Sequence, residues 1–291
     1  MLTINTYSKP IYILFDYEFL KNNLELNSFV FLLCSWNNSP NIINLAKSYS
    51  EYNIIILANS LEEKKHFEGK VKNDVLFCNH NAFLNENIFK IENISKKEYD
   101  LVIDSAFNTY KNVKLAKNIP NVVHIGYFTN HESSKNNSIV PNFGILANYL
   151  SVNGSYKRLN KNEISDFYNK SLMGGIFSNV EGACFASSQY LLCGLPVIST
   201  KSIGGRDIWY NEDNSIICES NEESVLEAYE TVKKKLFNRE FNREKIRNTH
   251  LKQMDEHRNT LVEYIKNKFL LLNENVDTVE IKNHLSNFKI T

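Results

Sequence analysis

Short apolar runs rich in β-branched and aromatic residues alternate with longer segments of helical period along most of this chain. Buried parallel strands read as continuous apolar runs because helices cover both faces of their sheet. The alternation therefore predicts an α/β fold with parallel sheets. The first four expected strands are "PIYILF" (10–15), "FVFLLC" (29–34), "NIIILA" (53–58) and "DVLFC" (74–78), with helices near 41–50 and 60–68.

A second series of apolar runs follows a polar stretch without sustained period, residues 79–98. A chain of 291 residues is long enough for two ordinary domains. We therefore expect an N-terminal domain over 1–92 and a C-terminal domain over 93–257. The second series of expected strands is "YDLVID" (99–104), "NVVHIGYF" (121–128), "NFGILA" (142–147), "GGIFS" (174–178), "PVIST" (196–200) and "NSIICE" (214–219). Its expected helices are near 110–118, at 161–171, from about 183, and over 221–270.

Charge and cysteine content limit the classes of binding partner and the cellular compartments that suit this chain. Acidic and basic residues number 33 each, so net charge gives no support to a nucleic-acid partner. The five cysteines show no CxxC spacing, which suits reduced thiols in a cytoplasmic protein. We find no apolar run of the roughly eighteen residues that span a bilayer and no secretory signal. Solvated helix faces are the favoured interpretation of the basic stretch 232–247, and a weak peripheral membrane role stays open.

The stretch "EGACFASSQYLLCGLPVIST" (181–200) carries the strongest functional signal. A strand ending near Ser178 and a helix beginning near Ala183 place free backbone amides at the edge where open α/β sheets bind ligands. These amides and the helix dipole favour an anion such as phosphate, and Gly182 permits close approach. Gly194 is expected to end the helix in the left-handed conformation.

Glu181 sets this stretch apart from an ordinary βαβ unit. Glutamate is not a favoured N-cap residue, and here a glycine follows it instead of a helix former. The loop "STKSIGGRD" (199–207) presents Gly204 and Gly205 at the end of the following strand, on the same sheet edge. Two neighbouring strand ends thus offer glycines at which a ligand can approach the backbone.

With these residues, "EGACFASSQYLLCGLPVISTKSIGG" resembles the donor-binding signature of GT-B fold glycosyltransferases of the family 4 type. The resemblance is strong over 173–220 and extends more weakly back to residue 99. It implies two Rossmann-like domains whose parallel sheets face a cleft. The first domain is short for the family, and residues 258–291 would cross back to it.

The resemblance also implies roles for individual residues. Glu181 would hydrogen-bond the transferred sugar and stabilise positive charge at its anomeric carbon. The amide of Gly182 and the helix N-terminus at Ala183 would hold phosphate, and Lys111 would contact the donor diphosphate. Gly204 and Gly205 would lie close to the donor.

Two positions depart from the family pattern. The acid that grips the nucleotide ribose falls at Gln189, whose amide still hydrogen-bonds a diol but without charge assistance. The arginine that faces the diphosphate falls at Ala106. Arg206 or Lys114 would substitute for it, or the donor would carry a single phosphate, as a CMP-linked sugar does.

Other candidates are given weaker interpretations. Asp16, Trp36, Asn37 and His80 stand at or near predicted strand ends, where a loop cap or a satisfied polar residue is the favoured reading. His124 is expected in the core, and His250 and His257 lie on a charged helix. None of these three has a metal partner at ligand spacing, and we expect neither a metal nor a cofactor.

Together these features predict a cytoplasmic, metal-independent and retaining glycosyltransferase. Its partners would be a nucleotide sugar and a glycan or lipid-linked acceptor, with a bacterial surface polysaccharide or glycoconjugate as product. Three alternatives stay open: a CMP-sugar-dependent transferase, a sugar-nucleotide epimerase, and a non-catalytic GT-B subunit. The epimerase needs acid and base residues that flank the sugar, which the sequence does not display.

Overall fold

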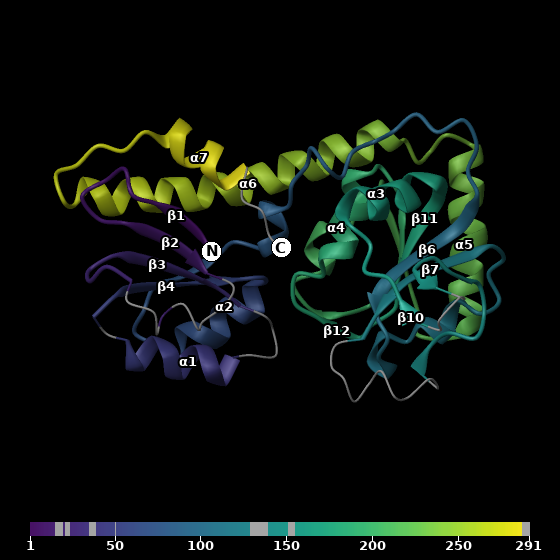
Figure 1. Cartoon of the computed structure of the whole chain (residues 1–291), viewed down its shortest axis with the longest axis horizontal. Coiled ribbons are helices and arrows are strands. Elements are labelled where there is room, and N and C mark those ends of the chain that lie inside the picture. The colour runs from purple at the N-terminus through teal and green to yellow at the C-terminus, as the bar shows by residue number, and fades with distance from the viewer. Residues whose placement is uncertain are drawn as a thin grey trace.

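Two sheets, each covered by helices, lie side by side in the computed structural model of the chain (Figure 1). The structure describes residues 1–14, 20, 24–34, 39–49, 51–128, 139–150 and 155–286, without the side chains of 39–40, 149–150 and 155–156.

The first sheet has five strands in the order of the sequence, and only its first strand is antiparallel to its neighbour. All five residues of the third strand are buried, as expected for a strand covered on both faces. The strands are β1 (Leu2–Ile4), β2 (Ile11–Leu14), β3 (Phe29–Leu33), β4 (Asn53–Ala58) and β5 (Val75–Phe77). Helices α1 (Ser39–Ser48) and α2 (Leu61–Glu68) follow β3 and β4 along the chain.

The second sheet is parallel throughout, in the order β15-β13-β11-β6-β7-β8. From the central strand β6 the chain first adds strands on one side and then crosses to the other side. The order therefore reverses between β6 and β11, and open α/β sheets bind ligands outside the carboxyl ends of strands at such a point. The strands are β6 (Tyr99–Ala106), β7 (Val122–Tyr127), β8 (Ile145–Leu146), β11 (Ser171–Ile176), β13 (Val197–Thr200) and β15 (Ser215–Cys218).

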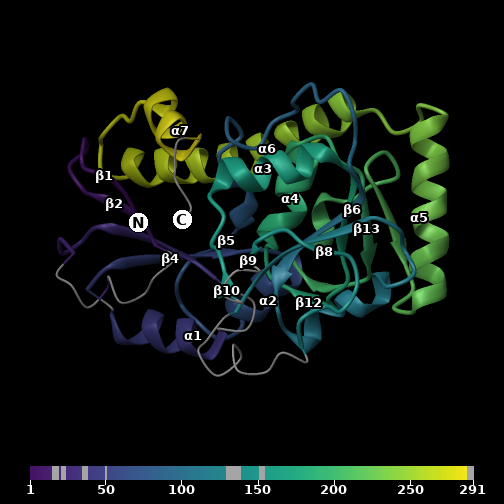
Figure 2. The ribbon, with the colours of Figure 1, turned by 45° about the vertical axis from the view of Figure 1, so that its right-hand side comes forward.

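Helices cover this second sheet, and two small two-stranded pairings complete the unit (Figure 2). The helices are α3 (Lys161–Lys170), α4 (Phe185–Leu192) and α5 (Glu222–Phe237). The pairings join β12 (Val180–Glu181) to β14 (Ile203–Gly204) and β9 (Tyr149–Leu150) to β10 (Ser155–Tyr156).

One long helix, α6 (Arg243–Leu270), runs along both units (Figures 1 and 2). Its first half contributes Ile246 and Met254 to the core of the second sheet. Its second half contributes Leu261 and Phe269 to the core of the first sheet, which α7 (Thr278–Ser286) also joins. The segment after residue 258 thus packs on the N-terminal sheet. The boundary at 92/93 stays a proposal, and residues before it, such as Phe89, pack in the core of the second sheet.

Three expected elements differ in the structure. The predicted helix at 110–118 is replaced by two short 3₁₀ turns, Thr109–Lys111 and Val113–Ala116, because Asn112 between them is left-handed. The predicted strand 142–147 is reduced to β8. The predicted helix 221–270 is two helices, because the chain turns at a left-handed Arg239 and α6 starts again from an Asn242 N-cap.

Candidate functional site

A small pocket lies at the carboxyl ends of β6 and β11, where the strand order of the second sheet reverses. Its internal volume is about 10 Å³, room for about one water molecule. This is far less than the roughly 300–1,000 Å³ typical of ligand pockets, so the pocket suits one small group of a larger ligand, such as a hydroxyl. Its polar lining consists of Asp104, Ser105, Lys111, Ser178, Glu181 and Cys184, and its apolar lining includes Ile103, Val113, Ile176 and Phe177.

Glu181 and Lys111 meet in this pocket as an ion pair. Their side chains are 10% and 14% exposed, and Ser178 Oγ donates to the same Glu181 oxygen at 2.6 Å. Burial alone lowers the pKa of Lys111, but the Glu181 carboxylate outweighs burial and the pKa lies above its usual value. Lys111 is therefore charged at neutral pH, and the two residues expected to serve the donor are brought together.

The N-terminus of α4 stands beside the pocket. Gly182 and Ala183 form the turn that leads from Glu181 into the helix, and Cys184 at the N-cap is left-handed, with φ 55°. The first amides of a helix have no intrahelical partner, so this end is suited to an anion. At the other end Gly194 is left-handed, and Gly194 N and Leu195 N donate to the carbonyls of Leu191 and Tyr190, which confirms the expected C-cap.

The two loop glycines lie in different surroundings. Gly204 has φ 120°, and a Cβ built there would lie 1.7 Å from the Glu181 carbonyl oxygen, so only glycine fits. A Cβ on Gly205 would instead lie 2.4 Å from Asn59 Cβ and 2.7 Å from Asn79 Nδ2. Gly205 thus contacts the N-terminal part of the protein, and it does not line the pocket.

Buried asparagines, which the sequence analysis did not single out, fasten these loops to the N-terminal part. Asn79 Nδ2 donates to the Gly205 carbonyl at 2.9 Å and to the Asn59 carbonyl at 3.0 Å. Asn81 Nδ2 donates to the Ala183 carbonyl at 2.7 Å. All three asparagines are at most 1% exposed. The turn before α4 is therefore held by side chains from another part of the chain, and polar residues in "LANS" and "CNHN" after strands were the available signal.

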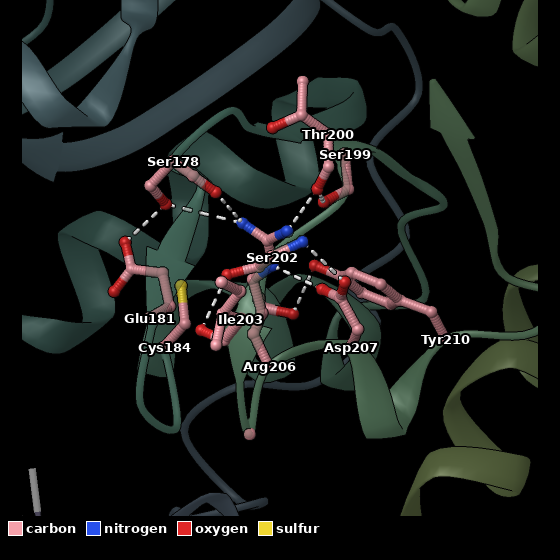
Figure 3. A network of polar contacts seen from close by, with 12 residues as sticks. Ser178, Glu181, Cys184, Ser199, Thr200, Ser202, Ile203, Arg206, Asp207 and Tyr210 are labelled. Carbon is pink, nitrogen blue, oxygen red and sulfur yellow. Dashed lines mark hydrogen bonds and ion pairs between the residues drawn. The ribbon is translucent and has the colours of Figure 1, made fainter. Parts of the chain in front are cut away.

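Arg206 lies inside the protein and does not line the pocket (Figure 3). Its guanidinium points between the ends of two strands and donates to the carbonyls of Ser178, at 2.9 Å, and Thr200. Its Nε donates to Asp207 at 2.8 Å. The structure thus places Arg206 where it joins β11 to β13, which argues against direct contact with a donor.

Gln189 belongs to a buried network that includes an acid absent from the sequence-based candidates, Asp104. Tyr168 Oη lies 2.5 Å from Asp104 Oδ2 and 3.0 Å from Gln189 Oε1, while the Asp104 amide donates to Tyr190 Oη at 2.7 Å. Burial raises the pKa of Asp104 to about 6. Asp104 stands at the carboxyl end of a predicted strand, and that position was the signal that could have found it.

The remaining candidates lie away from the pocket. Ala106 is buried and Lys114 is exposed, and neither lines it. His80 and His124 are 4% and 2% exposed, and burial lowers their pKa values to about 3 and about 4, as for core histidines. Asp16, Trp36 and Asn37 fall outside the described residues.

The described parts of the chain contain neither a cluster of metal ligands nor a helix that could span a membrane. No three His, Cys, Asp or Glu side chains there are grouped as metal ligands. No described helix has the length and apolar character that crossing a bilayer requires. All five cysteines are free.

Comparison with known proteins identifies the fold. No protein-family model and no curated protein matches the sequence. HepE from Anabaena, solved with UDP and glucose, superposes with a TM-score of 0.56 at 12% identity, over 95% of this chain and 70% of HepE. Sucrose-phosphate synthase from Thermosynechococcus elongatus gives 0.56 at 11% identity, over 88% and 71% of the two chains. A glycosyltransferase from Rickettsia africae ESF-5 gives 0.55 at 14% identity, over 86% and 76%.

At such low identities the likeness concerns the fold. The chain has the GT-B fold, an α/β architecture of two Rossmann-like units with parallel sheets, as the sequence analysis predicted.

Proposed function

We propose that the protein is a glycosyltransferase that moves a sugar from a nucleotide-sugar donor to an acceptor glycan or glycoconjugate. The observation that carries this proposal is the pocket at the strand-order reversal, where the Glu181–Lys111 pair lies beside the N-terminus of α4. Such an arrangement has a group for sugar hydroxyls and an adjacent place for an anionic leaving group. The GT-B fold supports this chemistry by analogy.

In this proposal the diphosphate lies against the amides that open α4. The Lys111 ammonium, which pairs with Glu181 in the structure, also reaches the diphosphate and stabilises the negative charge of the leaving group. A charge-assisted contact of this kind is roughly twice as strong as a neutral hydrogen bond. We propose that these groups stabilise the leaving group without a metal ion.

The transfer step would break the bond between the anomeric carbon and the phosphate oxygen, and both electrons would leave with the nucleotide. An acceptor hydroxyl oxygen would form the new bond on the same face of the sugar, and its proton would pass to the departing phosphate oxygen. Glu181 would stabilise the positive charge that develops at the anomeric carbon between these events. This sequence of events makes the enzyme a retaining transferase.

A uridine nucleotide is the first donor to test. HepE, whose fold this chain shares, has been solved with UDP and with UDP-glucose. We further propose a cytoplasmic reaction, which the free cysteines suit, and an acceptor in surface polysaccharide synthesis.

The test begins with thermal shift and calorimetry with UDP, GDP and CMP, because a ligand that binds the native state raises its melting temperature. We then expect Glu181→Ala to abolish sugar transfer while nucleotide binding stays largely intact. Glu219→Ala, which changes an exposed acid of the same domain outside the pocket, serves as control. Full transfer by Glu181→Ala would remove Glu181 from the chemistry.

Two observations favour a second candidate, a GT-B subunit that binds without catalysis. Ala106 and Gln189 replace groups that the family uses on its donor, and Arg206 is committed to carbonyls inside the protein. If no nucleotide shifts the melting temperature, this second candidate replaces the first.

A further inference from the structure

The pocket holds two carboxylates but only one cation among its lining residues. Lys111 pairs with Glu181, and no ion pair to Asp104 occurs within the described part of the chain. Asp104 is ionised at neutral pH, since its raised pKa is still about 6. The pocket therefore carries one negative charge that no side-chain partner neutralises.

Two buried tyrosines hold Asp104, one at its carboxylate and the other at its main-chain amide. Tyr168 from α3 and Tyr190 from α4 are 0% exposed, and their rings pack edge to face with centroids 4.7 Å apart. Tyr168 Oη hydrogen-bonds Asp104 Oδ2, and Tyr190 Oη accepts from the Asp104 amide. The Tyr190 ring also fills the space beside Gly174, where a Cβ would lie 2.2 Å from it. Buried rings thus hold the Asp104 main chain and one oxygen of its carboxylate.

The second oxygen of this carboxylate remains available. Among the described residues no group donates to Asp104 Oδ1, and this atom is not among the buried polar atoms without a partner. Because Asp104 lines the pocket and is only partly buried, a ligand in the pocket can reach it. An ionised carboxylate only accepts hydrogen bonds, so it pairs with a hydroxyl and repels another carboxylate.

We propose that Asp104 determines which sugar binds at the pocket: its carboxylate accepts one hydroxyl of a neutral sugar, which enters the pocket, and repels a sugar that carries a carboxylate. This inference rests on the proposed function and adds the substrate class to it. The diphosphate is assigned to Lys111 and the start of α4, because the Asp104 carboxylate repels a phosphate. Asp104 therefore contributes to recognition of the sugar and little to recognition of the nucleotide.

The experiment measures binding by calorimetry at pH 7.5 with UDP, UDP-glucose and UDP-glucuronate. If the nucleotide panel selects GDP, then GDP, GDP-mannose and GDP-mannuronate take their place. For the unchanged protein we expect UDP-glucose to bind at least tenfold more tightly than UDP-glucuronate. In Asp104→Asn this ratio should fall to about threefold or less, while the dissociation constant of UDP changes by no more than about threefold.

Two further variants separate recognition from folding. Tyr168→Phe removes the hydroxyl that orients the carboxylate and should lower the sugar ratio without changing the affinity for UDP. Asp100→Asn changes an acid at the other end of β6, outside the pocket, and should behave as the unchanged protein.

The outcomes distinguish this inference from the proposed function. If UDP binds but Asp104→Asn keeps the full preference for UDP-glucose, the role of Asp104 is refuted and the transferase proposal stands. If UDP-glucosamine binds more than tenfold tighter than UDP-glucose, Asp104 recognises a cation and not a hydroxyl. If no nucleotide binds to the unchanged protein, both proposals fail.

Discussion

The buried Arg206 offers the sharpest test of how the second sheet holds its ligand-binding edge. We consider Arg206→Met, which keeps most of the side-chain length and removes the guanidinium. The side chain is 0% exposed, and its partners are the Ser178 and Thr200 carbonyls and the Asp207 carboxylate. The variant leaves two strand-end carbonyls and one carboxylate without their donor.

Breaking a buried charge pair by removing one partner destabilises a protein by about 3–5 kcal/mol. Hydrogen bonds from a charged donor contribute about 1.5–3 kcal/mol each, so three of them simply added would exceed this range. Contributions of neighbouring groups are not additive, and we therefore use the range for the charge pair. The Asp207 side chain is 22% exposed and can regain water, so we expect the lower part of the range. At about 2–4 °C per kcal/mol, the melting temperature should fall by about 6–15 °C.

The assay is differential scanning calorimetry, followed by nucleotide binding well below the melting temperature of the variant. Arg158→Met removes an exposed arginine of the same domain and is the matched control, with an expected change of less than about 0.5 kcal/mol. We expect the folded variant to bind the nucleotide with an affinity close to that of the unchanged protein. A variant that keeps its melting temperature but binds nucleotide tenfold more weakly would refute this reasoning and return Arg206 to the donor site.

Three other predictions follow from the contacts. Gly205→Ala places a Cβ 2.4 Å from Asn59 Cβ and should destabilise the protein by about 1–3 kcal/mol. The control Gly69→Ala, whose Cβ would lie 3.8 Å from its nearest atom, should be tolerated. Equal denaturation midpoints for the two variants would contradict this contact. Asn81→Asp removes the donor to the Ala183 carbonyl and should lower the free energy of unfolding by about 1–3 kcal/mol. Calorimetry should also show weaker nucleotide binding, and an unchanged affinity would show that this turn does not contribute to the ligand site. Burial lowers the pKa values of His80 and His250 to about 3 and of His124 and His257 to about 4, so each neutral ring opposes the protonation that the unfolded chain undergoes as pH falls below about 6.5. Between pH 7 and 5 these four histidines lower the free energy of unfolding by about 7 kcal/mol. The raised pKa values of Glu63, about 7, and Asp104, about 6, restore roughly half of this, which leaves a net loss of about 4 kcal/mol. Urea denaturation measures this loss, and a midpoint that is equal or higher at pH 5 would contradict the sum.

Several positions were predictable because their geometry depends on near neighbours in the sequence. The position of Gly194 before "LPV" predicts a left-handed glycine at the end of a helix, and Gly194 is left-handed in the structure. The polar ends of apolar runs also marked the sheet edge that carries the pocket. Lys111 and Glu181 were both named from the resemblance, although the sequence did not indicate that they pair with each other.

Other features depend on residues that are distant in the sequence, and they were missed for that reason. Asn81 holds the carbonyl of a residue 102 positions away, and Tyr168 reaches Asp104 across 64 positions. Arg206 was predicted as a loop cation available to the donor, because nothing in the neighbouring sequence indicates that its guanidinium lies between two strand ends.

The sequence by itself determined the parallel strands of both sheets and the helix that follows Glu181, because hydrophobic period and turn residues act over a few positions. It did not indicate the antiparallel strand β1. Only the tertiary structure decided which polar groups meet. Ion pairs and hydrogen bonds form between groups that are close in space, and strand packing, which local sequence does not specify, decides which groups those are. It brings Asp104, Lys111 and Glu181 around one pocket and places Arg206 outside it.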